Sequence, residues 1–116
     1  MRATEASYVA RGLAERVETL KEAVAALALL KPRDFGPDDA VGLGALVALR
    51  DEDDREFVYF VAPAGGGERL DVAGVPVLVL TPHSPLGAGL VGGRVDEELE
   101  VALPGGRRTA VVAWLR

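Results

Sequence analysis

The stretch Pro76-Val-Leu-Val-Leu-Thr-Pro-His-Ser-Pro-Leu-Gly-Ala-Gly-Leu-Val-Gly-Gly93 decides the fold of this chain. Its first half is a run of β-branched and aliphatic residues, which predicts a buried strand over residues 75–81. The run stops at a Pro-His-Ser-Pro turn, and the Leu/Ala/Gly segment that follows predicts a short helix over residues 84–91. Ser84 can cap the free N–H groups of this helix, and proline suits its first position. We therefore expect a rigid strand-to-helix corner that displays its polar tip to solvent.

Further strands are expected on both sides of this corner, over residues 44–50, 56–61, 97–103 and 108–115. Asp51–Asp54 predicts a hairpin turn between the first two, and Pro104–Gly106 predicts a turn between the last two. The glycine-rich residues 62–67 are expected to form a loop. Short strands joined by hairpins indicate an α+β domain with an antiparallel sheet.

Residues 1–32 predict a helical arm that begins after Thr4 or Ser7 and ends at Lys31-Pro32. Its apolar positions, spaced four and three residues apart, form what we call the arm seam: Leu13, Val17, Leu20, Val24 and Leu27. Such a narrow seam suits one neighbouring helix, for example that of a second copy of the chain. It suits equally an amphipathic helix that lies on the domain's own sheet. A linker is expected over residues 33–40 and a domain over residues 41–116.

Composition limits the classes of function. The 116 residues are 49% apolar and include no cysteine, which indicates one packed core without disulfides or thiolate chemistry. No apolar run approaches the ~20 residues of a membrane span. Glu5 and Glu15 interrupt any secretory pattern, so we expect a cytoplasmic protein. Residues 33–71 carry ten acidic and four basic side chains, which disfavours direct sequence-specific binding of nucleic acid.

Residues that could carry catalysis are few. His83 is the single histidine, and it cannot easily form a nucleophile–base pair with the adjacent Ser84 because the two side chains diverge. One histidine also cannot make a histidine-rich metal site. Asp51–Asp54 lacks the spacing and the glycine of a calcium loop and is typical of a solvated turn. We expect no catalytic residues, no metal and no cofactor.

Three segments in one consistent order resemble the C-terminal domain of the bacterial Gre transcript-cleavage factors. They are Val41-Gly-Leu-Gly-Ala-Leu-Val-Ala-Leu49, Val77-Leu-Val-Leu-Thr-Pro-His-Ser-Pro-Leu-Gly-Ala-Gly-Leu-Val-Gly92 and Glu97-Glu-Leu-Glu-Val-Ala-Leu-Pro-Gly-Gly106. They are similar to the family's opening strand, its strand–Ser-Pro–small-residue signature and its acidic–Val–Pro-Gly-Gly hairpin. The resemblance covers about residues 41–116. It implies an FKBP-like antiparallel sheet with one short helix, docked on RNA polymerase beside the secondary channel.

In that family the Ser-Pro corner belongs to the loop that contacts the polymerase. The resemblance therefore implies that the partner is bound by the corner and its apolar neighbours, which are His83, Ser84, Pro85, Leu86 and Leu90. The position before the Ser-Pro pair is commonly Asp or Asn in the family and is His83 in this chain. This departure bears on the strength of the contact.

The arm departs further from the family. Gre factors carry a two-helix coiled-coil finger whose acidic tip helps to hold a catalytic magnesium ion in the polymerase. The residues before the linker have room for one helix, and residues 1–7 hold Glu5 but no paired Asp-x-x-Glu. Since metal chemistry needs paired carboxylates, we expect a regulator that does not cleave transcripts. Rnk, a regulator of nucleoside diphosphate kinase with a short arm, is an alternative assignment within the family.

Two functions of other classes stay open. The same scaffold can serve as a free-standing interaction module for a partner other than the polymerase. The FKBP-like architecture also suggests a prolyl isomerase, although fold analogy alone is a weak argument for activity. An isomerase pocket would be lined by aromatic side chains, and this chain has just six, of which only four fall in the domain: Phe57, Tyr59, Phe60 and Trp114.

Overall fold

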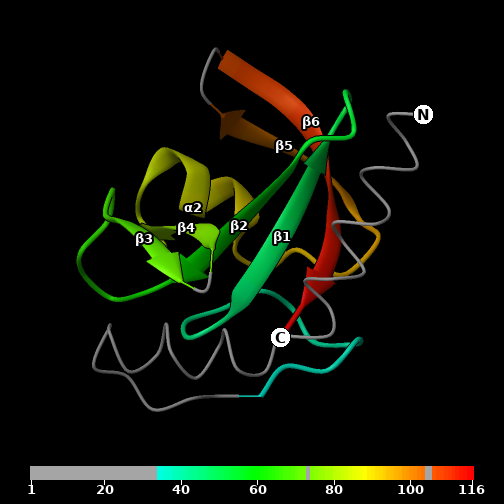
Figure 1. Ribbon diagram of the computed structural model, residues 1–116. Helices are drawn as coiled ribbons and strands as arrows, with labels where there is room; N and C mark the ends of the chain where they lie inside the picture. Colours follow the sequence, from blue (N-terminus) through cyan, green and yellow to red (C-terminus); the bar gives the residue numbers. More distant parts are fainter. Residues whose placement is uncertain (1–33, 73, 104–105) are drawn as a thin grey trace.

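The computed structural model describes residues 34–72, 74–103 and 106–116 (Figure 1). The predicted helical arm and its seam lie outside the described residues. The elements are β1 (Leu46–Asp51), β2 (Glu56–Val61), β3 (Arg69–Val72), β4 (Val75–Leu80), α2 (Pro85–Leu90), β5 (Glu98–Leu103) and β6 (Gly106–Leu115). The predicted short helix and the five predicted strands are confirmed, with shifted ends.

The six strands form one sheet in the order β3-β4-β2-β1-β6-β5. Four neighbouring pairs are antiparallel, but β2 and β4 run parallel, with Val58 beside Val77. The predicted all-antiparallel sheet is therefore wrong in this pairing, and the sheet is mixed. The cause is β3, which was not predicted because it has only four residues, two of them charged. The chain leaves β2, reverses direction in β3 and reverses again in the β3–β4 hairpin. β4 therefore runs in the same direction as β2, beside which it lies.

Two strands, β1 and β6, begin two residues away from their predicted starts. Residues 44–45 do not belong to β1, because Gly44 has a φ of 87° and turns the chain before the strand begins. β6 starts at Gly106, which pairs with Leu103, and so extends the β5–β6 hairpin towards its turn. The predicted Asp51–Asp54 turn is present between β1 and β2, where Asp54 adopts a φ of 62°.

Apolar side chains cover both faces of the central strands. We call the side on which α2 packs the first face; its buried residues include Val47, Leu49, Tyr59, Val61, Leu80, Leu90, Val101 and Val112. The opposite side, the second face, buries Leu46, Ala48, Val58, Phe60, Val77 and Val79. Figure 1 shows α2 against one side of the curved sheet, where it packs mainly on β5.

The segment expected to be a linker packs on this domain. Phe35 of this segment belongs to the first-face core, together with Val41 and Ala45 that follow it. A bridge between Ala40 and Arg94 and a hydrogen bond from Arg94 Nη1 to the Asp38 carbonyl (2.7 Å) hold the segment in place. In the described part of the chain, no helix is long and apolar enough to cross a membrane.

Candidate docking surface

The corner between β4 and α2 is fixed by the side chain of Ser84. Its hydroxyl donates to the Thr81 carbonyl (2.8 Å) and accepts from the N–H of Gly87 (3.0 Å). Pro85 occupies the first helical position, where its lack of an N–H costs nothing. The capping expected from the Ser-Pro pair is therefore confirmed, and it makes the strand and the short helix one rigid unit.

Small residues let α2 approach the sheet closely. A Cβ atom at Gly87 would collide with the Thr81 carbonyl oxygen, so glycine is required there. A Cβ atom at Gly89 would lie 3.0 Å from the Glu100 carbonyl oxygen of β5. The glycines of α2 thus allow the helix to pack directly on the backbone of Thr81 and of β5. This close packing fixes the orientation of the corner.

The structure separates the five predicted contact residues into three groups. His83 and Pro85 are exposed at the tip, whereas Ser84 and Leu86 are partly buried. Leu90 is completely buried, with an exposed fraction of 0%. It is therefore not accessible to a partner in this conformation, and its place among the contact residues stays a prediction. Leu90 instead anchors α2 in the first-face core, because the last turn of the helix points inwards.

A cavity of about 400 Å³ lies beside the corner. Leu86 belongs to the corner and also lines the cavity. The other lining residues are Glu56, Phe57, Val58, Tyr59, Arg69, Gly74, Val75, Pro76 and Leu78. The walls are mainly apolar, and the exposed Arg69 stands among them. Burial, together with the charge of Asp51, raises the pKa of Tyr59 to about 12, so its hydroxyl stays neutral at physiological pH.

The sequence places Phe57 and Tyr59 only among the aromatic residues of an isomerase pocket, and it assigns Leu78 to no site. The alternation in Glu56-Phe-Val-Tyr-Phe-Val61 puts Phe57 and Tyr59 on one face of a strand. It does not reveal that α2 covers only part of that face. The cavity arises from the parallel β2–β4 pairing and the short β3, neither of which the sequence pattern predicted.

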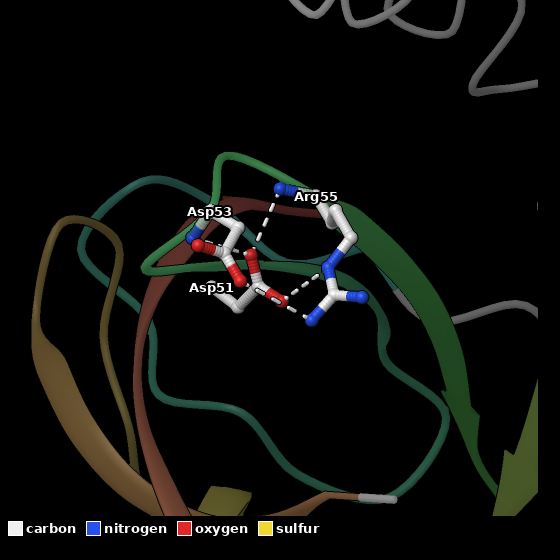
Figure 2. A network of polar contacts seen from close by, with 3 residues as sticks. All are labelled: Asp51, Asp53 and Arg55. Carbon is white, nitrogen blue, oxygen red and sulfur yellow. Dashed lines mark hydrogen bonds and ion pairs between the residues drawn. The ribbon is translucent and has the colours of Figure 1, made fainter.

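The β1–β2 hairpin forms a second polar cluster, centred on Asp51 (Figure 2). Asp51 Oδ1 accepts from the backbone N–H groups of Asp53 and Arg55, both at 2.9 Å, and Oδ2 accepts from Arg55 Nε at 2.9 Å. The Asp51 side chain is only 1% exposed, whereas that of Asp53 is 67% exposed. The expectation of a solvated turn therefore holds for the tip but not for Asp51.

Two opposing effects set the pKa of Asp51. Burial alone would raise it, but the backbone hydrogen bonds and the Arg55 guanidinium favour the carboxylate and hold the pKa below its ordinary value of 3.8. Arg55 also lies over the ring of Phe57, 6.0 Å from its centroid, and so links the hairpin to the cavity wall. All three donors of this network come from the hairpin itself, which makes it a structural lock.

The described residues offer no assembled metal centre, since no three of their His, Asp or Glu side chains come close enough together to hold an ion. The exposed His83 at the corner tip has no acidic or nucleophilic neighbour with which the structure records a hydrogen bond or ion pair among the described residues. The arrangement is suited to binding: a fixed polar tip stands next to an apolar cavity.

Comparison with known proteins agrees with this geometry. Residues 36–113 match the family described as "Transcription elongation factor, GreA/GreB, C-term". The match includes the corner, most of the sheet and the cavity. The chain belongs to the GreA/GreB family of transcription elongation factors.

Two relatives show the extent of the similarity. The transcription elongation factor GreA of Sphingopyxis alaskensis is 39% identical over 74 residues, which are 64% of this chain and 43% of that protein. GreA of Zymomonas mobilis is 36% identical over 90 residues, which are 73% of this chain and 49% of that protein. The chain spans about half the length of these relatives.

Solved structures agree on the fold. The crystal structure of GreA factor homolog 1 (Gfh1) of Thermus thermophilus aligns with a TM-score of 0.54 and 21% identity, covering 99% of this chain and 85% of that chain. Another structure of the transcription factor Gfh1 gives a TM-score of 0.57 and 24% identity, covering 99% and 84%. The mixed sheet with one short helix is thus the FKBP-like fold of the Gre C-terminal domain.

Proposed function

We propose that this protein is a regulator that binds RNA polymerase near its secondary channel without cleaving transcripts. Membership of a family of transcription elongation factors supports the choice of partner. The observation that carries the proposal is the exposed His83–Pro85 tip, which Ser84 holds rigid beside an apolar cavity. In this proposal the chain acts by binding and is not itself an enzyme.

The corner and the cavity offer complementary contacts. An apolar side chain of the partner enters the cavity and packs on Phe57, Leu78 and Leu86. Water then leaves both this side chain and the cavity walls. The tip provides polar contacts at the rim. Because the Ser84 hydrogen bonds already fix the backbone, little conformational entropy is lost when the partner binds. The exposed guanidinium of Arg69 favours an acidic group next to the apolar one.

The non-cleaving part of the proposal rests on the sequence of residues 1–33. This stretch contains four glutamates and no aspartate, so it holds no Asp-x-x-Glu pair. Glu15 and Glu18 are three residues apart, but they fall in the middle of the predicted helix and not at its tip. Activation of a magnesium ion requires carboxylates held as a pair at the reacting centre. A short-armed, Rnk-like relative would dock in the same way, so this assignment stays within the proposal.

The experiment compares two exposed prolines. Pro85→Asp places a charge on the docking tip, and an acid in the first turn is compatible with the helix. Pro37→Asp makes the same chemical change on the exposed loop before β1. We expect the wild type and Pro37→Asp to bind purified core RNA polymerase equally, and Pro85→Asp to bind at least about tenfold more weakly, as for loss of a central contact.

Stalled elongation complexes incubated with the same proteins provide the second readout. Transcripts should shorten no faster than with polymerase alone. Equal polymerase binding by all three proteins would refute the docking surface. Faster transcript shortening would refute the non-cleaving assignment and leave the docking surface intact. Capture of a different partner with no polymerase would favour the free-standing interaction module.

A further inference from the structure

The second face of the sheet is apolar and buried, and its cluster includes no residue of α2 or of the described segment before β1. Six side chains on β1, β2 and β4 form its centre, each at most 6% exposed: Leu46, Ala48, Val58, Phe60, Val77 and Val79. Among the described residues, Ala62 is the only buried member of this cluster from outside the strands. The helix α2 and the segment before β1 contribute to the first face instead. Side chains this deeply buried need a covering layer, and the described helix and loops supply only Ala62 to it.

Two polar atoms on the same face point to the same need. Glu56 pairs with Arg50 in the β1–β2 register and lies two and four residues before Val58 and Phe60, which places it on the same, second face. Its side chain is 9% exposed, and Oε1 is buried without a hydrogen-bond partner. The indole Nε1 of Trp114, which packs against this cluster, is buried without a partner as well. Buried polar groups normally find partners, so the occupant is expected to carry polar groups beside its apolar ones.

We propose that the occupant is the arm seam of the same chain, packed as a helix across the second face. The seam spans Leu13 to Leu27, and its 15 residues would form a helix about 22 Å long at about 1.5 Å per residue. Four strands at a spacing of about 4.8 Å are about 14 Å across, so this helix can cross β4, β2, β1 and β6. Its apolar stripe matches the apolar face.

Charge complementarity supports this choice of occupant. Arg16 and Lys21 flank the arm seam on its two sides when the segment is helical. Either cation can reach the edge of the contact and offer N–H donors to Glu56, whose Oε1 lacks one. Arg50 supplies a donor only to Oε2, at 3.4 Å. Acidic residues at these flanking positions would instead repel the buried Glu56 carboxylate.

In this proposal the arm completes the core on the second face of the sheet. The seam would not be free to pair with a second copy of the chain, and residues 41–116 alone would expose an apolar face. This inference concerns the second face, whereas the proposed polymerase contact uses the corner and the cavity, which shares only Glu56, Val58 and Val75 with that face. Each can fail without the other.

The chain has no cysteine, so single cysteines can probe the arm in the 116-residue chain. Leu20→Cys places a thiol in the seam, and Ala26→Cys places one on the side of the same predicted helix that faces away from the seam. We expect the thiol at position 20 to react with a maleimide at least about tenfold more slowly than that at position 26 in native buffer. The two rates should become equal in denaturant, and light scattering should show a monomer.

Trp114, the only tryptophan, reports on the second face directly. Leu20→Glu should shift its emission maximum to longer wavelength, whereas Ala26→Glu, with the same added charge, should leave the maximum in place. Equal native thiol reactivity at positions 20 and 26 would overturn the proposal. So would an unchanged Trp114 emission in Leu20→Glu, or a dimer whose thiol protection disappears on dilution, since a second copy would then be the occupant.

Discussion

The two polar turns of the domain, the Ser84 corner and the Asp51 hairpin, are closed by the same device but differ in charge. In each, a side-chain oxygen accepts backbone N–H groups two to four residues further along the chain. Ser84 is neutral and partly buried, and its neighbours His83 and Pro85 are exposed. Asp51 is ionised and buried, and it holds Arg55 as well.

This difference shows what each turn can do. Three charge-assisted bonds at Asp51 stabilise the hairpin, but they leave the carboxylate no free oxygen for a ligand. The Ser84 corner carries no buried charge, so a partner can cover it without removing an ion from water. The hairpin is therefore expected to matter for stability, and the corner for binding.

The largest expected effect is that of Asp51→Ala on stability. The substitution removes the acceptor for two backbone N–H groups and for Arg55, and we expect a loss of roughly 2–3 kcal/mol in the free energy of unfolding. The loss stays below that of a fully buried ion pair because the Arg55 side chain is 59% exposed and can turn to water. Urea unfolding followed by circular dichroism measures the change.

Asp53→Ala is the matched control, because this aspartate of the same turn is 67% exposed and should cost no more than about 0.5 kcal/mol. Acid sharpens the test. Since the folded-state pKa of Asp51 lies below 3.8, its contribution is complete above about pH 5 and is lost as the pH falls through the folded-state value. The stability gap between wild type and Asp51→Ala should therefore shrink in acid. A gap independent of pH would contradict the role of the ionised carboxylate.

A smaller effect is expected from Ser84→Ala, which removes the cap of α2 and should cost about 1 kcal/mol in urea unfolding. Ser84→Asp restores an acceptor for the Gly87 N–H, although it cannot donate to the Thr81 carbonyl. We expect it to recover part of the loss. If Ser84→Ala destabilised the domain as much as Asp51→Ala, the proposed division between a stabilising hairpin and a binding corner would fail.

Much of the fold could be predicted because local signals are strong. The Val-Leu-Val-Leu run and the Ser-Pro pair place β4 and α2 within two residues of their observed bounds. β3 could not be found, since Arg69-Leu-Asp-Val72 is short and half charged. Without β3, the parallel pairing of β2 and β4 could not be foreseen either, because strand direction depends on the strands in between.

The candidate site was predicted in part. The exposed tip follows from capping chemistry, but the burial of Leu90 does not, since six residues are too few to show which face of a helix points inwards. The burial of Asp51 is also hidden in the sequence, because Asp51-Glu-Asp-Asp54 contains four acids and nothing in it distinguishes the first. Long-range packing decides both.

The most direct test of the docking surface is site-specific photo-cross-linking to core RNA polymerase. A photoreactive amino acid at position 83 lies on the exposed corner tip, and the same amino acid at position 37 lies on an exposed loop before β1. The proposal predicts efficient cross-links to a polymerase subunit from position 83 and few from position 37. Equal yields from the two positions, or no cross-link from position 83, would contradict it.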